Sequence, residues 1–389
     1  MNTSPVTATL DFDPARIERV LVHRLGSLGD TVMALPGFHL VRRVFPRAKI
    51  TVLTNLPVQS KAPPLENVLG SSGLYDAVIA YPVGIRDVAA IARLRRQIAD
   101  QKFELVVSLA AARGLFNSAR DWCFFRSCGI PRTVGLPFAY ADLASPRQPD
   151  GSYEWEARRL VRRLAPLGPV ELAADEWWDL RLTPGEDAEA ARVLQTHRVA
   201  QPFLAVSVGT KVDTNDWGEA RWNTLVMRLA QHHPHLPLVA FGSREDRARS
   251  ERLLGCWRGP TANLCGVTAP RVSAAVLRSA TLFLGHDSGP MHLAACVGVP
   301  CVGIFSARNV AGKWYPRGRH NTILYHPTAC AGCHLDWCEH HQKKCLTSIT
   351  VTEVLDAAQQ HLAADNEARP RGHAAGPRPP VQPPVSDLV

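Results

Sequence analysis

The sequence predicts an α/β protein made of two domains, each built around its own parallel sheet. The chain has 389 residues, which is too many for one ordinary hydrophobic core and suits two. Apolar runs typical of buried strands alternate with helical stretches, as in parallel βαβ units, and this alternation restarts in the second half. Hydrophobic residues form 46% of the chain and charged residues 20%, which favours a globular protein over a disordered one.

In the first half, an apolar run at 20–22 enters a glycine-containing turn at 25–30. A helix is predicted over 31–44, because Pro46 prevents it from continuing. The other elements predicted in this half are strands at 49–54, 77–80 and 105–109 and a helix at 88–98.

In the second half, four more buried strands are predicted, at 203–208, 236–241, 281–284 and 301–305. The helices expected between and after them lie at 222–231, 245–254, 272–280, 291–297 and 351–363. From this order we place the domains at 17–175 and 176–365, after a flexible N-terminus at 1–16. The Pro-rich stretch at 366–389 is predicted to be disordered.

The formal net charge of +9 favours anionic partners, which include phosphorylated small molecules, anionic membrane surfaces and nucleic acid. The N-terminus lacks the pattern of a signal peptide, and no run approaches the roughly 18 apolar residues of a membrane span. We therefore expect a cytoplasmic protein. Arg42, Arg43, Arg95 and Arg96 either face an anionic membrane or simply solvate the surface.

The turn after the first strand is the first candidate site, because ligands of open parallel sheets bind beyond the carboxyl ends of the strands. Gly26 and Gly29 allow the backbone to bend sharply there and to approach a ligand closely. Asp30 falls at the start of the next helix. It is either an N-cap, a common use of Asp, or a carboxylate that acts on a ligand.

A more specific turn follows the strand at 281–284. There, residues 286–292 (HDSGPMH) lead from a strand into a helix whose first turn contains a proline. The free amides of Ser288, Gly289 and Met291, together with the helix dipole, make an anion site that suits a diphosphate. The alternative is that the segment only begins a buried helix.

Basic residues follow two other strands at the same kind of edge. Lys211, next to Thr210, follows the strand at 203–208 and either pairs with a phosphate or is a solvated surface lysine. Arg113 and Arg120 follow the strand at 105–109. They either hold phosphates or acidic groups of a ligand or are solvated helix residues.

Four of the ten cysteines, Cys330, Cys333, Cys338 and Cys345, cluster within 16 residues, close to His334, His340 and His341. This spacing is compatible with a tetrahedral structural zinc, although it lacks the paired form of most zinc motifs. Reduced thiols that pack a loop and a redox pair are the alternatives. None of these interpretations is catalytic.

Taken together, these motifs resemble glycosyltransferase family 9, the heptosyltransferases of lipopolysaccharide core assembly. The resemblance extends over residues 18–360. The matching stretches are 24–30 with Leu35 and Pro36, 209–211 with Trp217 and Trp222, 287–295, 305–309 and 314–316.

The resemblance implies a GT-B fold, in which two Rossmann-like domains face a cleft. It implies that the N-terminal domain takes a glycolipid acceptor, such as a lipopolysaccharide core, and that the C-terminal domain takes a nucleotide sugar, often ADP-heptose. The catalytic base of the family falls on Asp30, and Gly29, Arg113 and Arg120 are the candidate acceptor residues. The candidate donor residues are Thr210, Lys211, Asp287, Ser288, Gly289, Pro290, Met291 and His292. Many members have a lysine where this chain has Asn215, so phosphate neutralisation falls to Lys211 or is weaker.

One carboxylate suffices for a single displacement, which inverts the anomeric centre. Helix amides and Lys211 can stabilise a departing diphosphate, and we identify no Asp-x-Asp motif that would hold Mg²⁺ or Mn²⁺. We therefore expect an inverting transferase that needs no cofactor. The alternatives are a transferase of the same fold for a GDP- or UDP-sugar and a non-catalytic zinc- and nucleic-acid-binding protein, against which the absence of a nucleic-acid motif argues.

Overall fold

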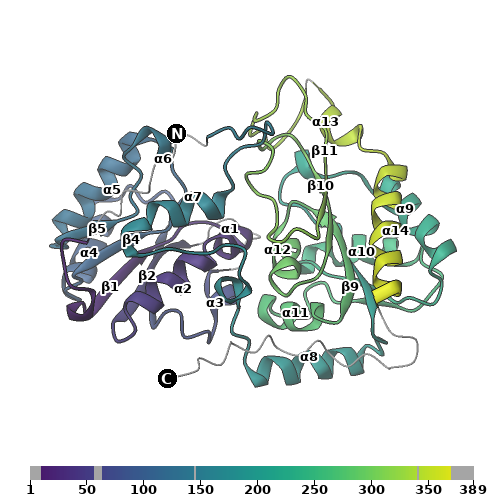
Figure 1. The fold of residues 1–389 in the computed structure, drawn as a ribbon, viewed down its shortest axis with the longest axis horizontal. Helices are drawn as coiled ribbons and strands as arrows, with labels where there is room; N and C mark the ends of the chain where they lie inside the picture. Colours follow the sequence, from purple (N-terminus) through teal and green to yellow (C-terminus); the bar gives the residue numbers. More distant parts are fainter. Residues whose placement is uncertain (1–9, 57–63, 144–145, 340, 369–389) are drawn as a thin grey trace, which may run out of the picture. The chain divides into compact units, whose positions relative to one another are not determined.

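The computed structural model describes residues 10–56, 64–143, 146–339 and 341–368. Residues 1–9 of the predicted flexible N-terminus and residues 369–389 of the predicted disordered tail lie outside these ranges. The chain divides into two compact units, Met1–Arg181 and Leu182–Val389. Each unit holds one parallel sheet with helices around it, which confirms the predicted pair of Rossmann-like domains (Figure 1).

The first unit contains a five-stranded sheet in the order β3-β2-β1-β4-β5. Its strands are β1 (Arg19–His23), β2 (Lys49–Leu56), β3 (Ala77–Pro82), β4 (Leu105–Ser108) and β5 (Arg132–Val134). All neighbours pair in parallel, and Val20 of β1 is in register with Ile50 of β2 and Leu105 of β4. The carboxyl ends of the strands therefore share one edge.

The helices of the first unit connect these strands. They are α1 (Leu28–Met33), α2 (Leu35–Val44), α3 (Glu66–Leu69), α4 (Val88–Ala99), α5 (Leu115–Ser127), α6 (Tyr140–Leu143) and α7 (Glu156–Arg163), with the 3-10 turns η1 (Pro14–Arg16), η2 (Ala165–Leu167) and η3 (Asp175–Trp178). One core cluster joins α4 and α5 to the sheet, with Ile98 and Phe125 among its members beside Leu21 and Val106.

The second unit contains a six-stranded sheet in the order β11-β10-β9-β6-β7-β8. Its strands are β6 (Phe203–Ser207), β7 (Leu238–Ala240), β8 (Thr261–Asn263), β9 (Ala280–His286), β10 (Cys301–Phe305) and β11 (Thr322–Tyr325). The helices are α8 (Pro184–Thr196), α9 (Glu219–His232), α10 (Arg247–Leu254), α11 (Pro270–Leu277), α12 (Gly289–Cys296), α13 (Lys344–Thr347) and α14 (Val351–Ala368), with η4 (Asp213–Asn215) and η5 (Arg244–Asp246).

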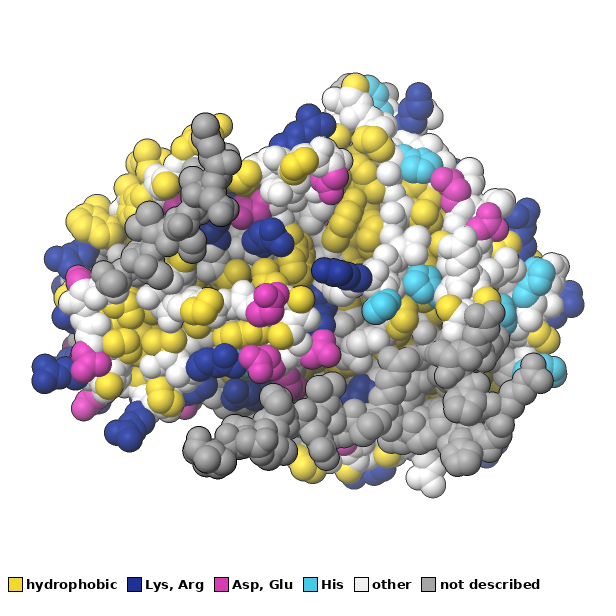
Figure 2. Space-filling view, in the orientation of Figure 1, with side chains coloured by type: hydrophobic (Ala, Val, Ile, Leu, Met, Phe, Trp, Pro, Cys, Tyr) yellow, Lys and Arg dark blue, Asp and Glu magenta, His cyan; other side chains and the backbone are white. Residues whose placement is uncertain are grey.

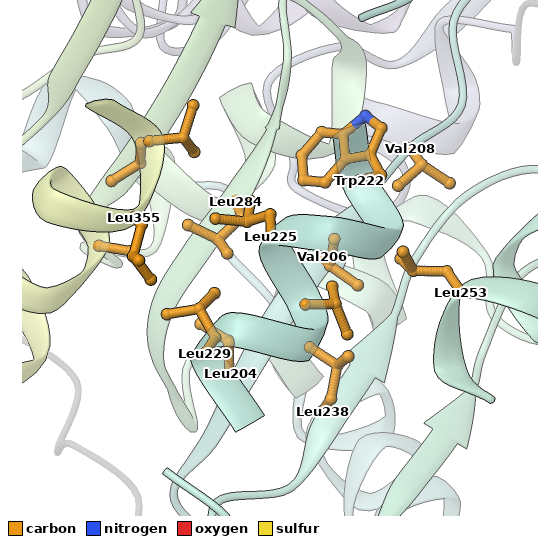
Figure 3. Packing of buried hydrophobic residues seen from close by; sticks show 14 of the residues in the cluster. Leu204, Val206, Val208, Trp222, Leu225, Leu229, Leu238, Leu253, Leu284 and Leu355 are labelled. Carbon is orange, nitrogen blue, oxygen red and sulfur yellow. The ribbon is translucent and has the colours of Figure 1, made fainter. Parts of the chain in front are cut away.

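The core of the second unit lies between the sheet and helices α9 and α14. Leu204 and Val206 of β6 and Leu284 of β9 pack against Leu225 and Trp222 of α9, as Figure 3 shows. Leu355 of α14 belongs to the same cluster. The last helix is therefore an integral part of this unit.

Several predicted helices differ from those observed. Helices α9 and α12 begin three and two residues earlier than predicted, and α14 extends to Ala368, so residues 366–368 are helical and the prediction of disorder there is wrong. The helix expected over 31–44 begins earlier and is split at Ala34 into α1 and α2, because Pro36 at the second position of α2 has no N–H to continue the ladder. The helix expected over 272–280 ends at Leu277, and Ala280 already belongs to β9. Among the described residues, we find no helix with both the length and the apolar character to cross a membrane.

Candidate functional site

The turn between β1 and α1 holds Asp30 at the carboxyl edge of the first sheet. Ser27 is the N-cap of α1, and Asp30 is the third residue of the helix. Its Oδ2 accepts hydrogen bonds from the Ser27 N–H (2.7 Å) and Oγ–H (2.8 Å), which forms a capping box. The interpretation of Asp30 as the N-cap itself is therefore wrong, although the carboxylate does contribute to capping.

Gly26 makes the sharp bend at this turn. Its φ is +124°, and a Cβ atom there would lie 2.7 Å from the Cβ of Asp30, so no other residue fits. Gly29, for which the same role was predicted, is the second residue of α1 and has no positive φ. The helical backbone removes the need for a bend there, and Gly26 alone provides it.

Arg24 is a buried cation beside Asp30. It is only 1% exposed, its Nη1 donates to the Leu109 carbonyl at 2.6 Å, and its Nη2 lies 4.0 Å from Oδ1 of Asp30. Neither its Nε nor its Nη2 has a hydrogen-bond partner. Burial lowers the pKa of Arg24, while the charges of Asp30 and Glu156 oppose that shift. The positive charge of Arg24 thus lies near Oδ1 of Asp30, the carboxylate oxygen that takes no part in the capping box.

Helix α7 places more buried charge behind this turn. Arg159 pairs with Glu156 at 2.5 Å, and both side chains are buried. The Nη2 of Arg163 donates to the carbonyl of Ala110 at 2.7 Å, and burial lowers the pKa of Arg163 to about 10. Arg24 and Arg163 therefore hold the two residues that directly follow β4.

The predicted acceptor residues Arg113 and Arg120 share one partner, Asp121. Nη2 of Arg113 lies 2.6 Å from Oδ2 of Asp121, and Nη2 of Arg120 lies 2.9 Å from Oδ1. Both arginines are partly exposed, and Arg113 precedes α5 rather than lying within it. The cluster keeps one surplus positive charge. Because β1 and β4 are neighbours, it lies at the same sheet edge as Asp30.

In the second unit, residues 287–292 connect β9 to α12. Ser288 is the N-cap in extended conformation, and its Oγ is buried without a hydrogen-bond partner. The helix begins at Gly289, so its first amides have no acceptor within the helix. Oδ1 of Asp287 lies 3.7 Å from Nε2 of the buried His292, and its Oδ2 accepts a hydrogen bond from Asn309 at 3.3 Å. The strand, the loop and the helix N-terminus are thus arranged as the sequence predicts, with Pro290 in the first turn and Met291 buried.

The loop after β6 lies at the same edge, because β6 and β9 are neighbouring strands. The Oγ1 of Thr210 donates to the carbonyl of Val212 at 3.1 Å, and Lys211 is exposed. Asn215 is buried, and its Oδ1 accepts a hydrogen bond from Ser306 at 2.6 Å. The structure thus brings the predicted donor residues of the second unit to one sheet edge.

His286 anchors this loop to the end of β9, a role the sequence did not reveal. Its Nε2 accepts hydrogen bonds from the Trp217 N–H and the Trp222 indole N–H, both at 3.2 Å. Two donors at Nε2 require the neutral ring with its proton on Nδ1. Burial agrees with this, since it lowers the pKa of His286 to about 3.

The turn geometry of Asp30 recurs in the second unit, after β7. Gly242, Ser243 and Asp246 repeat the Gly-Ser-x-x-Asp pattern, and Oδ2 of Asp246 accepts from the Ser243 N–H and Oγ–H at 2.8 Å. The Asp246 carboxylate lies where a Cβ atom on Gly209 would be placed, at 2.4 Å from its Cγ. Gly209 is therefore fixed as glycine by packing rather than by a ligand.

The four clustered cysteines line one cavity of about 350 Å³, together with His341, Lys343 and Arg308. All four thiols are free, and burial raises the pKa of Cys345, as does the proximity of the other three. Within the ranges that the structure describes, no three His, Cys, Asp or Glu side chains are placed to hold a metal ion. His340 lies outside those ranges. A structural zinc here stays a prediction.

The cysteine-containing loop braces the edge of the second sheet. Leu335 accepts a hydrogen bond from Thr214 Oγ1 at 2.7 Å, and Arg308 donates to the carbonyls of His334 and Leu335, both at 3.0 Å. The Nζ of Lys343 lies 3.1 Å from Oδ1 of Asp213. The loop thus holds the segments after β6 and β10, on either side of the α12 N-terminus.

Comparisons with known proteins point in one direction. The model of glycosyltransferase family 9 (heptosyltransferase) matches residues 91–343. The lipopolysaccharide heptosyltransferase 3 of Escherichia coli K12 is 23% identical over 360 residues, which are 87% of this chain and 96% of that protein. A family 9 glycosyltransferase from Veillonella parvula superposes with a TM-score of 0.64 at 18% identity, over 92% of this chain and 99% of that one. The E. coli heptosyltransferase WaaC, solved with ADP, superposes with a TM-score of 0.57 at 16% identity, over 88% and 99%.

Proposed function

This chain belongs to glycosyltransferase family 9, and from that premise we propose that it inverts the anomeric centre as it moves heptose from ADP-heptose to a lipopolysaccharide core. The relatives support the substrates, because one is named a lipopolysaccharide heptosyltransferase and another was solved with ADP. The observation that carries the proposal is the α12 N-terminus, where the Oγ of Ser288 is buried without a partner beside helix amides that have no acceptor within the helix. That is the environment a diphosphate needs.

Asp30 is the proposed base. The capping box occupies Oδ2, which leaves Oδ1 to accept the proton of the acceptor hydroxyl. The hydroxyl oxygen then bonds to the anomeric carbon as the bond from that carbon to the diphosphate breaks. A single displacement inverts the configuration at this carbon. Nη2 of Arg24 lies 4.0 Å from this oxygen and places a positive charge beside it.

The leaving diphosphate is proposed to bind at residues 287–292. The amides of Gly289 and Met291 and the hydroxyl of Ser288 donate to its oxygens, and the helix dipole adds positive potential. Lys211, on the neighbouring loop, contributes a point charge. Asn215 does not supply one, because its side-chain amide is neutral, and its Oδ1 accepts a hydrogen bond from Ser306 inside the unit.

The acceptor is proposed to bind at the edge of the first sheet. The surplus positive charge of Arg113, Arg120 and Asp121 suits the acidic groups of a lipopolysaccharide core. Gly29, in the first turn of α1, leaves room beside Asp30 for the acceptor hydroxyl because it has no side chain.

A donor panel tests the proposal directly. We expect ADP and ADP-heptose to raise the melting temperature, because ligand that binds only the folded state stabilises it by mass action. GDP, UDP and their sugars should shift it less at equal concentration. With ADP-heptose and a heptose-free core acceptor, the product should carry the inverted anomeric configuration by NMR. A larger shift with GDP or UDP, or a retained configuration, would overturn the donor or the mechanism.

Transfer should continue in excess EDTA, because helix amides and Lys211 take the place of a divalent cation at the diphosphate. The one Asp-x-Asp sequence, Asp11-Phe12-Asp13, precedes β1 at the opposite edge of the sheet, where Asp13 caps η1. The rate is to be measured with EDTA and again with added Mg²⁺ or Mn²⁺. Circular dichroism on the same samples reports whether chelation unfolds the cysteine loop. Activity lost in EDTA and restored by Mg²⁺, with the fold intact, would refute metal independence.

A further inference from the structure

The first unit exposes large hydrophobic side chains in one region. Phe116 is 80% exposed and Tyr140 is 85% exposed, and Leu115, Trp122 and Phe138 are exposed as well. We call these five residues the outer apolar surface. Figure 2 shows hydrophobic side chains gathered over the part of this unit where α5 lies in Figure 1. Contiguous apolar surface of this kind marks an interaction site in soluble proteins.

The topology places this surface beside the proposed acceptor edge. Leu115 and Phe116 begin α5, the next element after β4, and Phe138 and Tyr140 follow β5. The strand order β1-β4-β5 puts both segments at the carboxyl edge, next to the turn that holds Asp30. Whatever binds the outer apolar surface therefore lies near the acceptor.

Helix α5 is apolar on the side that faces solvent. Residues 115, 119 and 122 lie on one helical face, and residues 116 and 123 lie beside it, all of them exposed. Phe125 and Ser118 point the other way, into the unit. A surface helix normally presents charged residues outward, so the outward face of α5 needs a partner to cover it.

Basic residues are abundant on α4 and α5 and in the segments next to them. Over residues 83–127, all of which the structure describes, seven arginines and one lysine are exposed, against two aspartates. The basic residues are Arg86, Arg93, Arg95, Arg96, Lys102, Arg113, Arg120 and Arg126. Arg95 of α4 also donates to the carbonyl of Ser127 at 2.7 Å, which joins the two helices into one layer.

We propose that the outer apolar surface docks on an anionic lipid bilayer, with its aromatic side chains in the interface and the arginines against lipid phosphates. Leu, Phe and Trp with flanking arginines are the composition of interfacial helices. A second copy of the chain fits less well, because a two-fold contact would bring the arginines of both copies together. The inference rests on the proposed function in one respect, since a lipid-linked acceptor places its sugar at such a surface.

Vesicle sedimentation tests the proposal on the full chain. We expect binding to phosphatidylcholine vesicles with 30 mol% phosphatidylglycerol, and much weaker binding to pure phosphatidylcholine. Phe116→Ser and Tyr140→Ser should each weaken binding by about tenfold, the effect of removing one buried aromatic side chain. Arg96→Gln should weaken it by about fivefold and reduce its salt dependence.

Two matched controls lie in the second unit. Met227→Ser removes an exposed apolar side chain of α9, and Arg258→Gln removes an exposed arginine, so neither should change vesicle binding. All variants are expected to keep the wild-type melting temperature, because the altered side chains are exposed. Circular dichroism verifies this before binding is measured.

The outcomes separate the docking surface from the proposed function. Wild-type protein that does not bind anionic vesicles, or Phe116→Ser binding as tightly as wild type, overturns the docking surface. So does an oligomer that Phe116→Ser dissociates in sedimentation velocity. None of these three results bears on transfer, which is measured separately on a delipidated core acceptor. We expect Phe116→Ser and Tyr140→Ser to lose vesicle binding and to keep transfer to that acceptor. Wild-type protein that binds vesicles but transfers to no acceptor would overturn the proposed function alone.

Discussion

Asp30→Asn is expected to lower kcat by roughly 10²–10⁴-fold, the usual effect of removing a positioned general base. Asparagine is nearly the same size, and its carbonyl oxygen can still accept the two hydrogen bonds from Ser27. The asparagine side chain cannot accept a proton at neutral pH, so the variant loses the proposed base and keeps the helix cap. ADP affinity should stay unchanged, because the proposed diphosphate site belongs to the other unit. The measurements are kcat, ADP affinity and melting temperature on the same preparation.

Glu353→Gln is the matched control for this variant. Glu353 accepts the N–H and Oγ–H of Thr350, both at 2.7 Å, in a capping box of the same kind at the start of α14. If lost capping were the cause of a lower kcat, both variants would show it. A kcat for Asp30→Asn within about threefold of wild type would remove Asp30 from the mechanism, because general acid–base groups contribute far more.

Ser288→Asp is expected to weaken ADP binding by at least about 100-fold without destabilising the fold. Aspartate is as good an N-cap as serine, so α12 should keep or gain stability. Its carboxylate, however, would stand about 4 Å from a bound diphosphate, and repulsion at that distance amounts to several kcal/mol at an effective dielectric of about 20. Calorimetry with ADP and a thermal melt of the same variant measure both effects.

Two controls isolate charge from shape. Ser288→Asn has the size of the aspartate variant and caps as well, but it carries no charge, so it should bind ADP far better. Ala269→Asp places a carboxylate at the N-cap of α11, which also starts with a proline, and should leave ADP affinity unchanged. Equal ADP affinity in Ser288→Asp and Ser288→Asn would show that no diphosphate lies at α12.

Much of the fold could be predicted from the sequence, because buried parallel strands form continuous apolar runs. β1, β2, β6 and β10 are of this kind. The three strands that were missed, β5, β8 and β11, are edge strands of only three or four residues. β5 and β11 are only half-buried, and β5 and β8 also have little apolar character. α5 escaped notice for a different reason: its apolar residues lie on both faces, so no amphipathic period appears.

The candidate site was predictable where local sequence determines local structure. The turn before Asp30 and the start of α12 carry glycine, serine and proline signals that need no tertiary context. The partners of these turns come from far along the chain and leave no such signal. Nothing in the sequence marks Glu156 and Arg159, which stand at ordinary helical spacing, yet both are buried, and the charge of Glu156 acts on Arg24. His286, likewise, reveals its role only through Trp217 and Trp222, which lie more than 60 residues earlier.

The contacts between the loop after β6 and the C-terminal part of the chain have a consequence for folding during translation. The indole N–H of Trp217 donates to the carbonyl of Ile349 at 2.9 Å, and Leu346, Ile349 and Leu362 belong to the core of that unit. The loop that begins with Thr210 therefore completes its native packing only after the nascent chain has been made through α14. The first unit depends on no residue after Arg181 for its sheet, so it can fold during translation. A ribosome that stalls between the two units would thus leave a folded first unit, with the proposed base Asp30 in place, on a chain that lacks the proposed diphosphate site.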